Sequence, residues 1–191
     1  ISDAEKIYRL SRKKENKTLE FKESFSLNKK AWDYQNDTNK DKKINEDLEK
    51  IIIKKENELE KSSIKTINGF LNTEGGTLLI GVKEPKKGKP NQIVGINPEL
   101  KLFHNNDEDD FKQYLGNKLE SSIDNYIKFV NNINFKMVKV EDKYVCRIDC
   151  KPPQDSYVYV YNGDFFIRKN PSTQQLSTKQ YAEYVKRNPR G

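Results

Sequence analysis

The chain has 191 residues, of which 34% are hydrophobic and 34% charged, and its 36 Lys and Arg against 29 Asp and Glu give a net charge of +7. This length suffices for one folded domain with a hydrophobic core, and no apolar stretch approaches the roughly 20 residues that a membrane helix requires. Two cysteines and a charged N-terminal segment argue against a disulfide scaffold and a secretory signal, so we expect a cytoplasmic protein that does not engage a membrane.

The basic excess is concentrated at the two ends of the chain. Residues 1–31 hold nine basic and five acidic residues, residues 151–191 hold seven and three, and the middle holds twenty and twenty-one. A basic surface on a small domain favours a phosphate-rich partner such as nucleic acid, because neutralising phosphates releases counterions. A general bias towards Lys, Asn and Ile would produce the same excess, so charge alone leaves both interpretations open.

The N-terminal quarter predicts a short lead-in followed by a strand. Residues 1–14 are expected to form a polar lead-in segment or a short helix. The segment KTLEFK (17–22) alternates with period two, so Leu19 and Phe21 should face a core while the charged side chains share the opposite face. Residues 33–47 are polar and rich in turn-forming residues, which predicts an exposed loop.

A helix followed by a hairpin is predicted at the centre of the chain. Apolar residues recur at helical spacing from Glu46 to Leu71, as expected for one long helix or two consecutive helices. The pair Gly75-Gly76 should end this helix, since Gly tolerates the positive φ that such an exit often needs. A buried strand over residues 77–82 follows, and residues 92–96 are predicted to be its hairpin partner.

The C-terminal half predicts a helix, two strand pairs and a last helix, at residues 111–123, 135–140 with 144–150, 158–161 with 165–168, and 177–188. The dipeptide Asn162-Gly163 is a strong hairpin signal, and Ser177 with Gln180 forms a capping box at the start of the last helix. Together these elements predict a single α+β domain over residues 1–191, with a mostly antiparallel sheet and packed helices.

The sequence does not support catalysis by a thiol or a zinc ion, nor the binding of ATP. The only histidine, His104, is far in sequence from Cys146 and Cys150, so neither a thiol nucleophile nor a zinc site is predicted, and both cysteines are expected in the core. No phosphate-binding loop of the type GxxxxGK[ST] occurs, so we expect no ATP as a cofactor.

Acidic residues near the N-terminus form the best candidate for a catalytic site. Glu20 and Lys22 share one face of the predicted strand, Glu15 lies just before it, and Glu84 follows the strand at 77–82. Convergent carboxylates can hold Mg²⁺ or Mn²⁺, which activates water for phosphodiester cleavage, while a lysine stabilises the developing charge. We therefore treat Glu15, Glu20 and Glu84 as candidate metal ligands, and Lys22 as the residue that would stabilise the charge developing during cleavage. Glu and Lys side by side on a solvated strand would give the same pattern.

Other side chains are candidates for direct contact with nucleic acid. Four donors that suit phosphate oxygens follow a predicted strand, where they could equally form a solvated loop: Arg168, Lys169, Ser172 and Thr173. Three tyrosines alternate on a strand face, where they would stack on unpaired bases or pack in the core or a dimer interface: Tyr157, Tyr159 and Tyr161. Glu74, beside the glycine pair, could accept backbone hydrogen bonds of the turn or contact a substrate.

Several segments resemble one known family. In order and character they are similar to the Schlafen-type AlbA-like domain: ENKTLEFK (15–22), WDY (32–34), KTINGFLNTEGGTLLIGV (65–82) and IVGI (93–96). The C-terminal half resembles the same family at VCRI (145–148), FIR (166–168) and the closing helix. The resemblance is to the prokaryotic branch, whose domains are described as DNA-binding or transcription-regulator modules and are often attached to other domains.

The resemblance implies a site as well as a fold. In animal Schlafen proteins two such lobes form a basic groove, and a site of three carboxylates in some of them cuts transfer RNA with a metal ion. The first two acids correspond in spacing to Glu15 and Glu20. The third acid lies in an aspartate-rich segment where this chain has Lys83-Glu84, and Lys83 brings a positive charge while Pro85 bends the chain away. Family membership therefore does not by itself imply nuclease activity.

The sequence thus predicts a nucleic-acid-binding domain, for DNA or RNA, that is phosphate-driven, largely sequence-tolerant and one module of a larger protein. Because the chain holds one lobe, we expect a homodimer to complete a two-sided groove. The first alternative is a metal-dependent endoribonuclease that uses Glu15, Glu20 and Glu84. The second is a structural assembly module.

Overall fold

The computed structural model describes residues 1–27, 46–86 and 88–191, with side chains in the long helix described from Lys54 onward. The WDY segment and residues 33–45 of the expected loop lie outside the described residues. The last two residues of that expected loop, Glu46 and Asp47, belong instead to the long helix.

A four-stranded sheet with the order β1-β2-β6-β5 forms the centre of the fold. Its strands are β1 (Leu19–Lys22), β2 (Gly76–Ile80), β5 (Ile133–Val140) and β6 (Lys143–Cys150). β1 runs parallel to β2, whereas β2 with β6 and β5 with β6 are antiparallel. The predicted α+β class with a mostly antiparallel sheet is confirmed.

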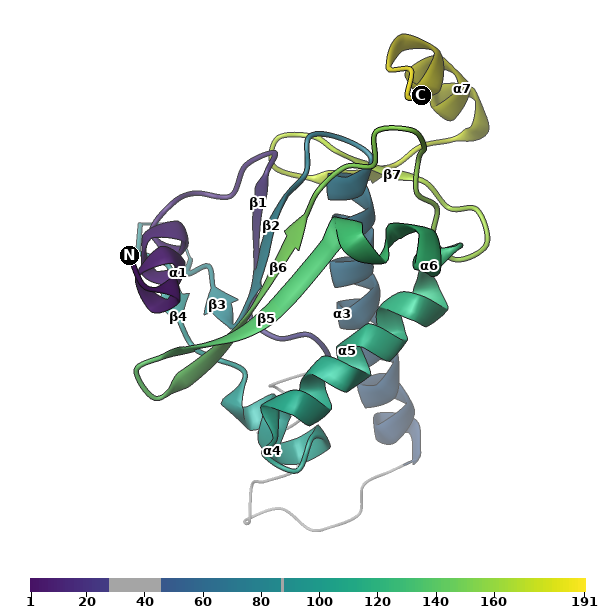
Figure 1. Cartoon of the computed structure of the whole chain (residues 1–191). Coiled ribbons are helices and arrows are strands. Elements are labelled where there is room, and N and C mark those ends of the chain that lie inside the picture. The colour runs from purple at the N-terminus through teal and green to yellow at the C-terminus, as the bar shows by residue number, and fades with distance from the viewer. Residues whose placement is uncertain (28–45, 87) are drawn as a thin grey trace.

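Helices cover both faces of this sheet (Figure 1). On one face lie α3 (Glu46–Leu71), α4 (Asn97–Phe103), α5 (Glu108–Ser122) and the short α6 (Tyr126–Phe129), and on the other lies α1 (Asp3–Ser11). A strand buried on two faces needs apolar neighbours in succession. Leu78 and Leu79 of β2 accordingly point in opposite directions, Leu78 into the larger core and Leu79 into a smaller core with Ile7 of α1.

The long helix α3 is continuous and ends at the predicted glycine pair. Of the two predicted alternatives, one long helix is therefore correct, and Ser63 is buried within it. Gly75 adopts a φ of +81° and its N–H donates to the Phe70 carbonyl at 2.9 Å. A Cβ at Gly75 would lie 2.6 Å from the Cys150 carbonyl oxygen, so only glycine fits this exit.

The predicted hairpin of residues 77–82 with 92–96 is only partly correct. Residues up to Ile80 belong to β2, and the hairpin is restricted to β3 (Val82–Lys83) with β4 (Gln92–Ile93). Gly81 separates the two strands, because its φ of +106° breaks the extended backbone. Its N–H donates to the Lys22 carbonyl, so this glycine also fastens the end of β1.

The predicted pairing of residues 158–161 with 165–168 is wrong. Only an isolated bridge between Val160 and Asp164 forms, across a turn in which Asn162 has the expected positive φ. β7 (Phe166–Arg168) pairs instead with β8 (Thr173–Gln175).

Two buried amides of α3 explain this change of partner. Asn68 Nδ2 donates to the Val158 carbonyl at 2.9 Å, and Asn68 Oδ1 accepts from the Phe166 N–H at 2.9 Å. Asn72 Oδ1 accepts from the Val158 N–H at 2.9 Å, while its Nδ2 donates to the carbonyls of Val158 and Phe166 at 2.8 and 3.1 Å. These side chains satisfy buried backbone groups that a hairpin ladder would otherwise pair.

The last helix forms as the capping box predicts. α7 (Thr178–Arg187) starts after Ser177, whose hydroxyl accepts from the Gln180 N–H at 3.3 Å while the Gln180 side chain accepts from the Ser177 N–H at 3.0 Å. The Tyr184 hydroxyl then donates to the Asn72 carbonyl at 2.7 Å, which ties α7 to the end of α3.

Replacing Asn72 by Ala should therefore destabilise the domain by about 1–3 kcal/mol for each buried backbone group that it leaves unpaired. Urea denaturation measures the free energy of unfolding. Asn117→Ala, at an exposed position on α5, is the matched control. Equal stabilities of the two variants, within about 0.5 kcal/mol, would contradict the role of the amides.

Candidate nucleic-acid interface

Arg168 is directed into the protein, although the sequence suggested a phosphate-binding or a solvated loop, both of which would expose it. Its side chain is almost fully buried, and its guanidinium carbon lies 4.9 Å from the centroid of the Phe70 ring. Nη1 donates to Thr173 Oγ1 at 3.0 Å and Nη2 to the Asn16 carbonyl at 2.7 Å. The guanidinium thus connects β7 and β8 with the segment that leads into β1, and in this arrangement it does not offer its donors to a ligand in solvent.

Glu20 is held between two cations. Its Oε1 lies 2.7 Å from Lys22 Nζ, and its Oε2 lies 3.0 Å from Arg168 Nη1. Only 8% of Glu20 is exposed. Each carboxylate oxygen therefore already has a charged partner, as a buried carboxylate requires.

Glu20 and Glu84 both lie close enough to Glu15 for their charges to act on it. Glu15 Oε1 accepts from the Phe21 N–H at 2.8 Å. Partial burial raises the pKa of Glu15, and the charges of Glu20 and Glu84 raise it further, against the backbone hydrogen bond that lowers it. Glu84 itself is exposed.

The acids as placed do not fit a divalent metal. Both oxygens of Glu20 are engaged by cations, and one oxygen of Glu15 is engaged by the backbone. Within residues 1–27, 46–86 and 88–191, no three His, Cys, Asp or Glu side chains are grouped so that they could hold one ion. The role of Glu15, Glu20 and Glu84 in metal binding remains a prediction.

The remaining candidate residues differ in their exposure to solvent and in their contacts. Lys169 and Ser172 are exposed between β7 and β8, where they could reach a ligand. Glu74 forms an ion pair with Lys17. Both cysteines are buried in the larger core and free, as expected.

Two of the three tyrosines hold α7 in place. Tyr157 and Tyr159 pack against Phe165, with ring centroids 5.5 and 5.6 Å away, and Phe165 in turn lies 4.9 Å from Tyr181 of α7. The Tyr159 and Tyr181 hydroxyls are hydrogen-bonded to each other. Tyr161 lies apart from this cluster, with the Lys61 ammonium 5.3 Å from its ring centroid.

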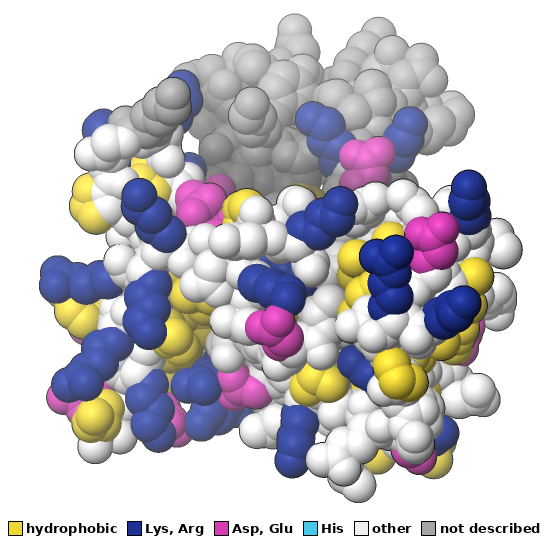
Figure 2. All heavy atoms as spheres, turned by 90° about the horizontal axis from the view of Figure 1, so that it is seen from above, with side chains coloured by type: hydrophobic (Ala, Val, Ile, Leu, Met, Phe, Trp, Pro, Cys, Tyr) yellow, Lys and Arg dark blue, Asp and Glu magenta, His cyan; other side chains and the backbone are white. Residues whose placement is uncertain are grey.

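Lysine and arginine side chains spread over the face at which β1 starts and β6 ends (Figure 2). We call this the basic face and define it by six side chains of the elements gathered there: Lys17, Lys151, Lys169, Lys179, Lys186 and Arg187. Among the described residues, Lys17 alone of these six forms an ion pair. The charge excess of the C-terminal segment was the sequence signal for this face, but it could not identify α7 as a main contributor.

The fold and this face define an α+β domain with a basic surface. The family model "Schlafen, AlbA_2" matches residues 15–177, so the chain belongs to this family, and the predicted family is confirmed, whereas the prokaryotic branch stays a prediction. Membership points to a function related to nucleic acids.

Comparison with curated proteins finds no match. Among solved structures, the crystal structure of the DIP2311 protein from Corynebacterium diphtheriae matches over 89% of this chain and 27% of that one, with 14% identity and a TM-score of 0.46. The chain thus spans little more than a quarter of that protein's length. In the part of the chain that the structure describes, no helix combines the length and apolar character needed to cross a bilayer.

The interaction among the three acids leads to a pH prediction. The pKa of Glu15, followed by NMR of its carboxyl carbon, should lie above its usual value and should fall in Glu84→Gln, because one repulsive charge is removed. Since the folded protein binds this proton more tightly than the unfolded chain, the contribution of Glu15 to the free energy of unfolding should decrease as pH rises through and above about 4.5. Glu120→Gln, on exposed α5 surface, is the control. A Glu15 pKa that is unchanged in Glu84→Gln would show that these two acids do not interact.

Proposed function

We propose that this domain binds nucleic acid through the phosphate backbone, with little dependence on sequence, and serves as one module of a larger protein. The observation that carries the proposal is the basic face, where five of the six defining side chains form no ion pair among the described residues. Uncompensated cations on one surface attract a polyanion, and their effect is strongest at low ionic strength.

The arrangement of acidic groups supports the same proposal. Arg168 and Lys22 neutralise Glu20, and Lys17 neutralises Glu74, so neither carboxylate opposes a phosphate backbone near this face. A charged group that is paired internally contributes little repulsion to a ligand outside.

The type of side chain favours sequence tolerance. Five of the six side chains of the basic face are lysines, which act as flexible point charges, whereas sequence readout commonly uses the rigid fork of arginine. The rings of Tyr157 and Tyr159 are engaged in fastening α7, which leaves phosphate contact as the main mode of binding.

The salt dependence of binding tests this proposal. Affinity for single-stranded RNA, transfer RNA and duplex DNA, measured by fluorescence anisotropy, should fall as salt rises, with a log–log slope of about 0.7 to 0.9 per phosphate contact. The double variant Lys169→Glu, Lys186→Glu should weaken binding to all sequences of one type similarly and reduce the slope by nearly two contacts.

The matched control is Lys101→Glu, Lys139→Glu, which reverses two exposed lysines of α4 and β5, away from the basic face. Equal losses in the two double variants, or affinity that does not change between about 50 and 200 mM salt, would contradict phosphate binding at this face.

Sedimentation of the same samples, free and bound, determines whether a homodimer forms. Parallel samples with Mg²⁺, Mn²⁺ or EDTA report cleavage, which decides the alternative of an endoribonuclease.

A further inference from the structure

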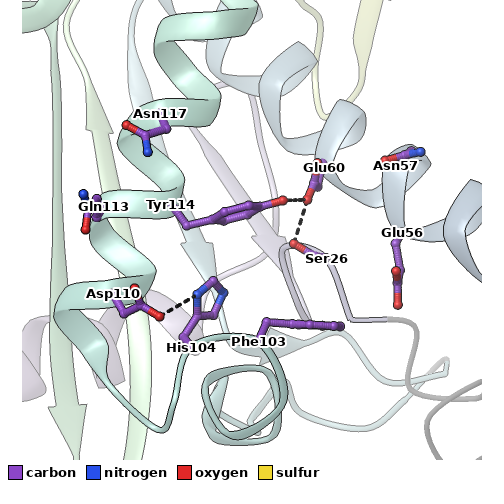
Figure 3. A pocket seen from close by; sticks show the side chains of 10 residues that line it. All are labelled: Ser26, Glu56, Asn57, Glu60, Phe103, His104, Asp110, Gln113, Tyr114 and Asn117. Carbon is purple, nitrogen blue, oxygen red and sulfur yellow. Dashed lines mark hydrogen bonds and ion pairs between the residues drawn. The ribbon is translucent and has the colours of Figure 1, made fainter.

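A cleft of about 500 Å³ opens between α3, α4 and α5, on elements that contribute nothing to the basic face (Figure 3). Aromatic rings of Phe103 and Tyr114 line it together with the amides of Asn57, Gln113 and Asn117. Phe103 and Tyr114 are 46% and 36% exposed, so their faces are available to a ligand. Flat apolar walls with a few amide groups suit a planar, polar-edged ring.

Two glutamates of α3 line the cleft. One of them is held by hydrogen bonds and an ion pair, and the other has no such partner within the described part of the chain. Glu60, 4% exposed, accepts hydrogen bonds from Ser26 Oγ at 2.9 Å and from the Tyr114 hydroxyl, and lies 2.8 Å from Lys118 Nζ. Glu56, one turn earlier on α3, makes neither an ion pair nor a hydrogen bond within the described part of the chain. Partial burial raises the pKa of Glu56, and the charge of Glu60 adds to this effect. A ligand that donates hydrogen bonds to Glu56 would offset that cost.

His104 gives an independent indication of a ligand. The side chain is 3% exposed, its Nδ1 lies 3.8 Å from Asp110 Oδ2, and its buried Nε2 has no hydrogen-bond partner in the described structure. Burial lowers the pKa of His104, although Asp110 opposes this, and the lowering favours the neutral ring, whose Nε2 is an acceptor when Nδ1 carries the proton. A buried acceptor without a donor is costly, which makes this wall of the cleft suited to a group that can donate.

A second hollow of about 720 Å³ lies beside the cleft and shares Asn57 with it, and its charged lining residues are Lys54, Glu58, Lys61 and Lys118. Lys54 and Lys61 line this hollow, are exposed and form no ion pair among the described residues. Ser121 adds a hydroxyl, and the buried hydroxyl of Tyr161 has no hydrogen-bond partner there. Lysines with hydroxyl donors favour a phosphate group.

The linings of the cleft and of the hollow are offset along α5. On α5, Lys118 lies one turn after Tyr114 and Ser121 lies two turns after it. At about 1.5 Å per residue, Lys118 and Ser121 are therefore about 6 and 10 Å further along the helix than Tyr114. A ribose separates the base and 5′-phosphate of a nucleotide by a comparable span. The cleft is thus acidic and aromatic where a base would lie and basic where its phosphate would lie.

We propose that the α3–α5 cleft binds a guanine nucleotide, with the base against Phe103 and Tyr114, its edge on Glu56, and its phosphate at Lys54 and Lys61. Guanine carries its N1–H and 2-amino donors side by side, so one carboxylate can accept both. Adenine lacks this pair of donors. The nucleotide is either free or the 5′-terminal residue of a strand. A zwitterion such as arginine would match the charges, but it would leave the aromatic walls and the amides of Asn57 and Asn117 largely unused.

Calorimetric titration of the domain with 5′-GMP, 5′-AMP, guanosine, inorganic phosphate and arginine tests the proposal. GMP should bind about tenfold or more tightly than AMP, as one bidentate contact allows, and more tightly than guanosine or phosphate alone. Comparison of GMP with the dinucleotide pGpU distinguishes the sources, because tighter binding of pGpU identifies a strand end and equal or weaker binding identifies a free nucleotide.

Variants of exposed or partly exposed side chains locate the ligand, and an unchanged melting temperature shows that each is folded. Glu56→Gln should reduce the preference for GMP over AMP at least fivefold, and Lys61→Ala should weaken GMP but not guanosine. Phe103→Ala should weaken all nucleosides and nucleotides. The basic-face variant Lys169→Glu, Lys186→Glu is the control and should bind GMP as the unchanged chain does, so the result is independent of the proposed function. Equal affinity for GMP and AMP, tighter binding of arginine, or an unaltered preference in Glu56→Gln would overturn the proposal.

Discussion

The buried guanidinium of Arg168 is the interaction on which the arrangement of the candidate site depends. It lies beneath the start of β1, contacts Glu20, and is stacked on Phe70 of α3. Helix α3 comes this close because residue 69 is glycine, and a Cβ there would lie 3.2 Å from Arg168 Cγ and 3.3 Å from the Ile167 backbone. A buried charge is tolerated only when its partners are complete, and a carboxylate, a hydroxyl and backbone carbonyls supply them here.

This interaction separates two kinds of positive charge. Arg168 and Lys22 neutralise an internal acid and belong to the structure, whereas Lys169 and the lysines of α7 remain directed outward. A phosphate backbone would meet the second kind. The same pairing occupies both oxygens of Glu20, a carboxylate that the predicted metal site would need.

Local patterns predicted much of the fold. Period-two alternation identified β1 because Leu19 and Phe21 do face a core, and the capping box of Ser177 with Gln180 forms as written in the sequence. The Asn162-Gly163 turn was also correctly recognised, but not the strand partners beside it, since the amides of Asn68 and Asn72 come from a helix about 90 residues earlier. No window of sequence contains that contact.

The candidate site was less predictable for a related reason. A charged residue after a strand is normally solvated, so nothing local distinguishes the inward Arg168 from the outward Lys169. His104 has polar neighbours in the sequence, yet it is buried because α4 and α5 enclose it against Phe111, with ring centroids 5.2 Å apart. Both cases depend on tertiary packing that brings distant elements together.

A double-mutant cycle between Glu20 and Arg168 tests the central claim most directly, with the free energy of unfolding measured for the unchanged chain, Arg168→Met, Glu20→Gln and the double variant. Arg168→Met alone should cost about 3 kcal/mol or more, because it leaves a buried carboxylate with Lys22 as its one cation. The double variant should be more stable than the sum of the single effects predicts, by about 1–3 kcal/mol. Effects that add within about 0.5 kcal/mol would show that the two side chains are not coupled, and would contradict the account of how this site is held together.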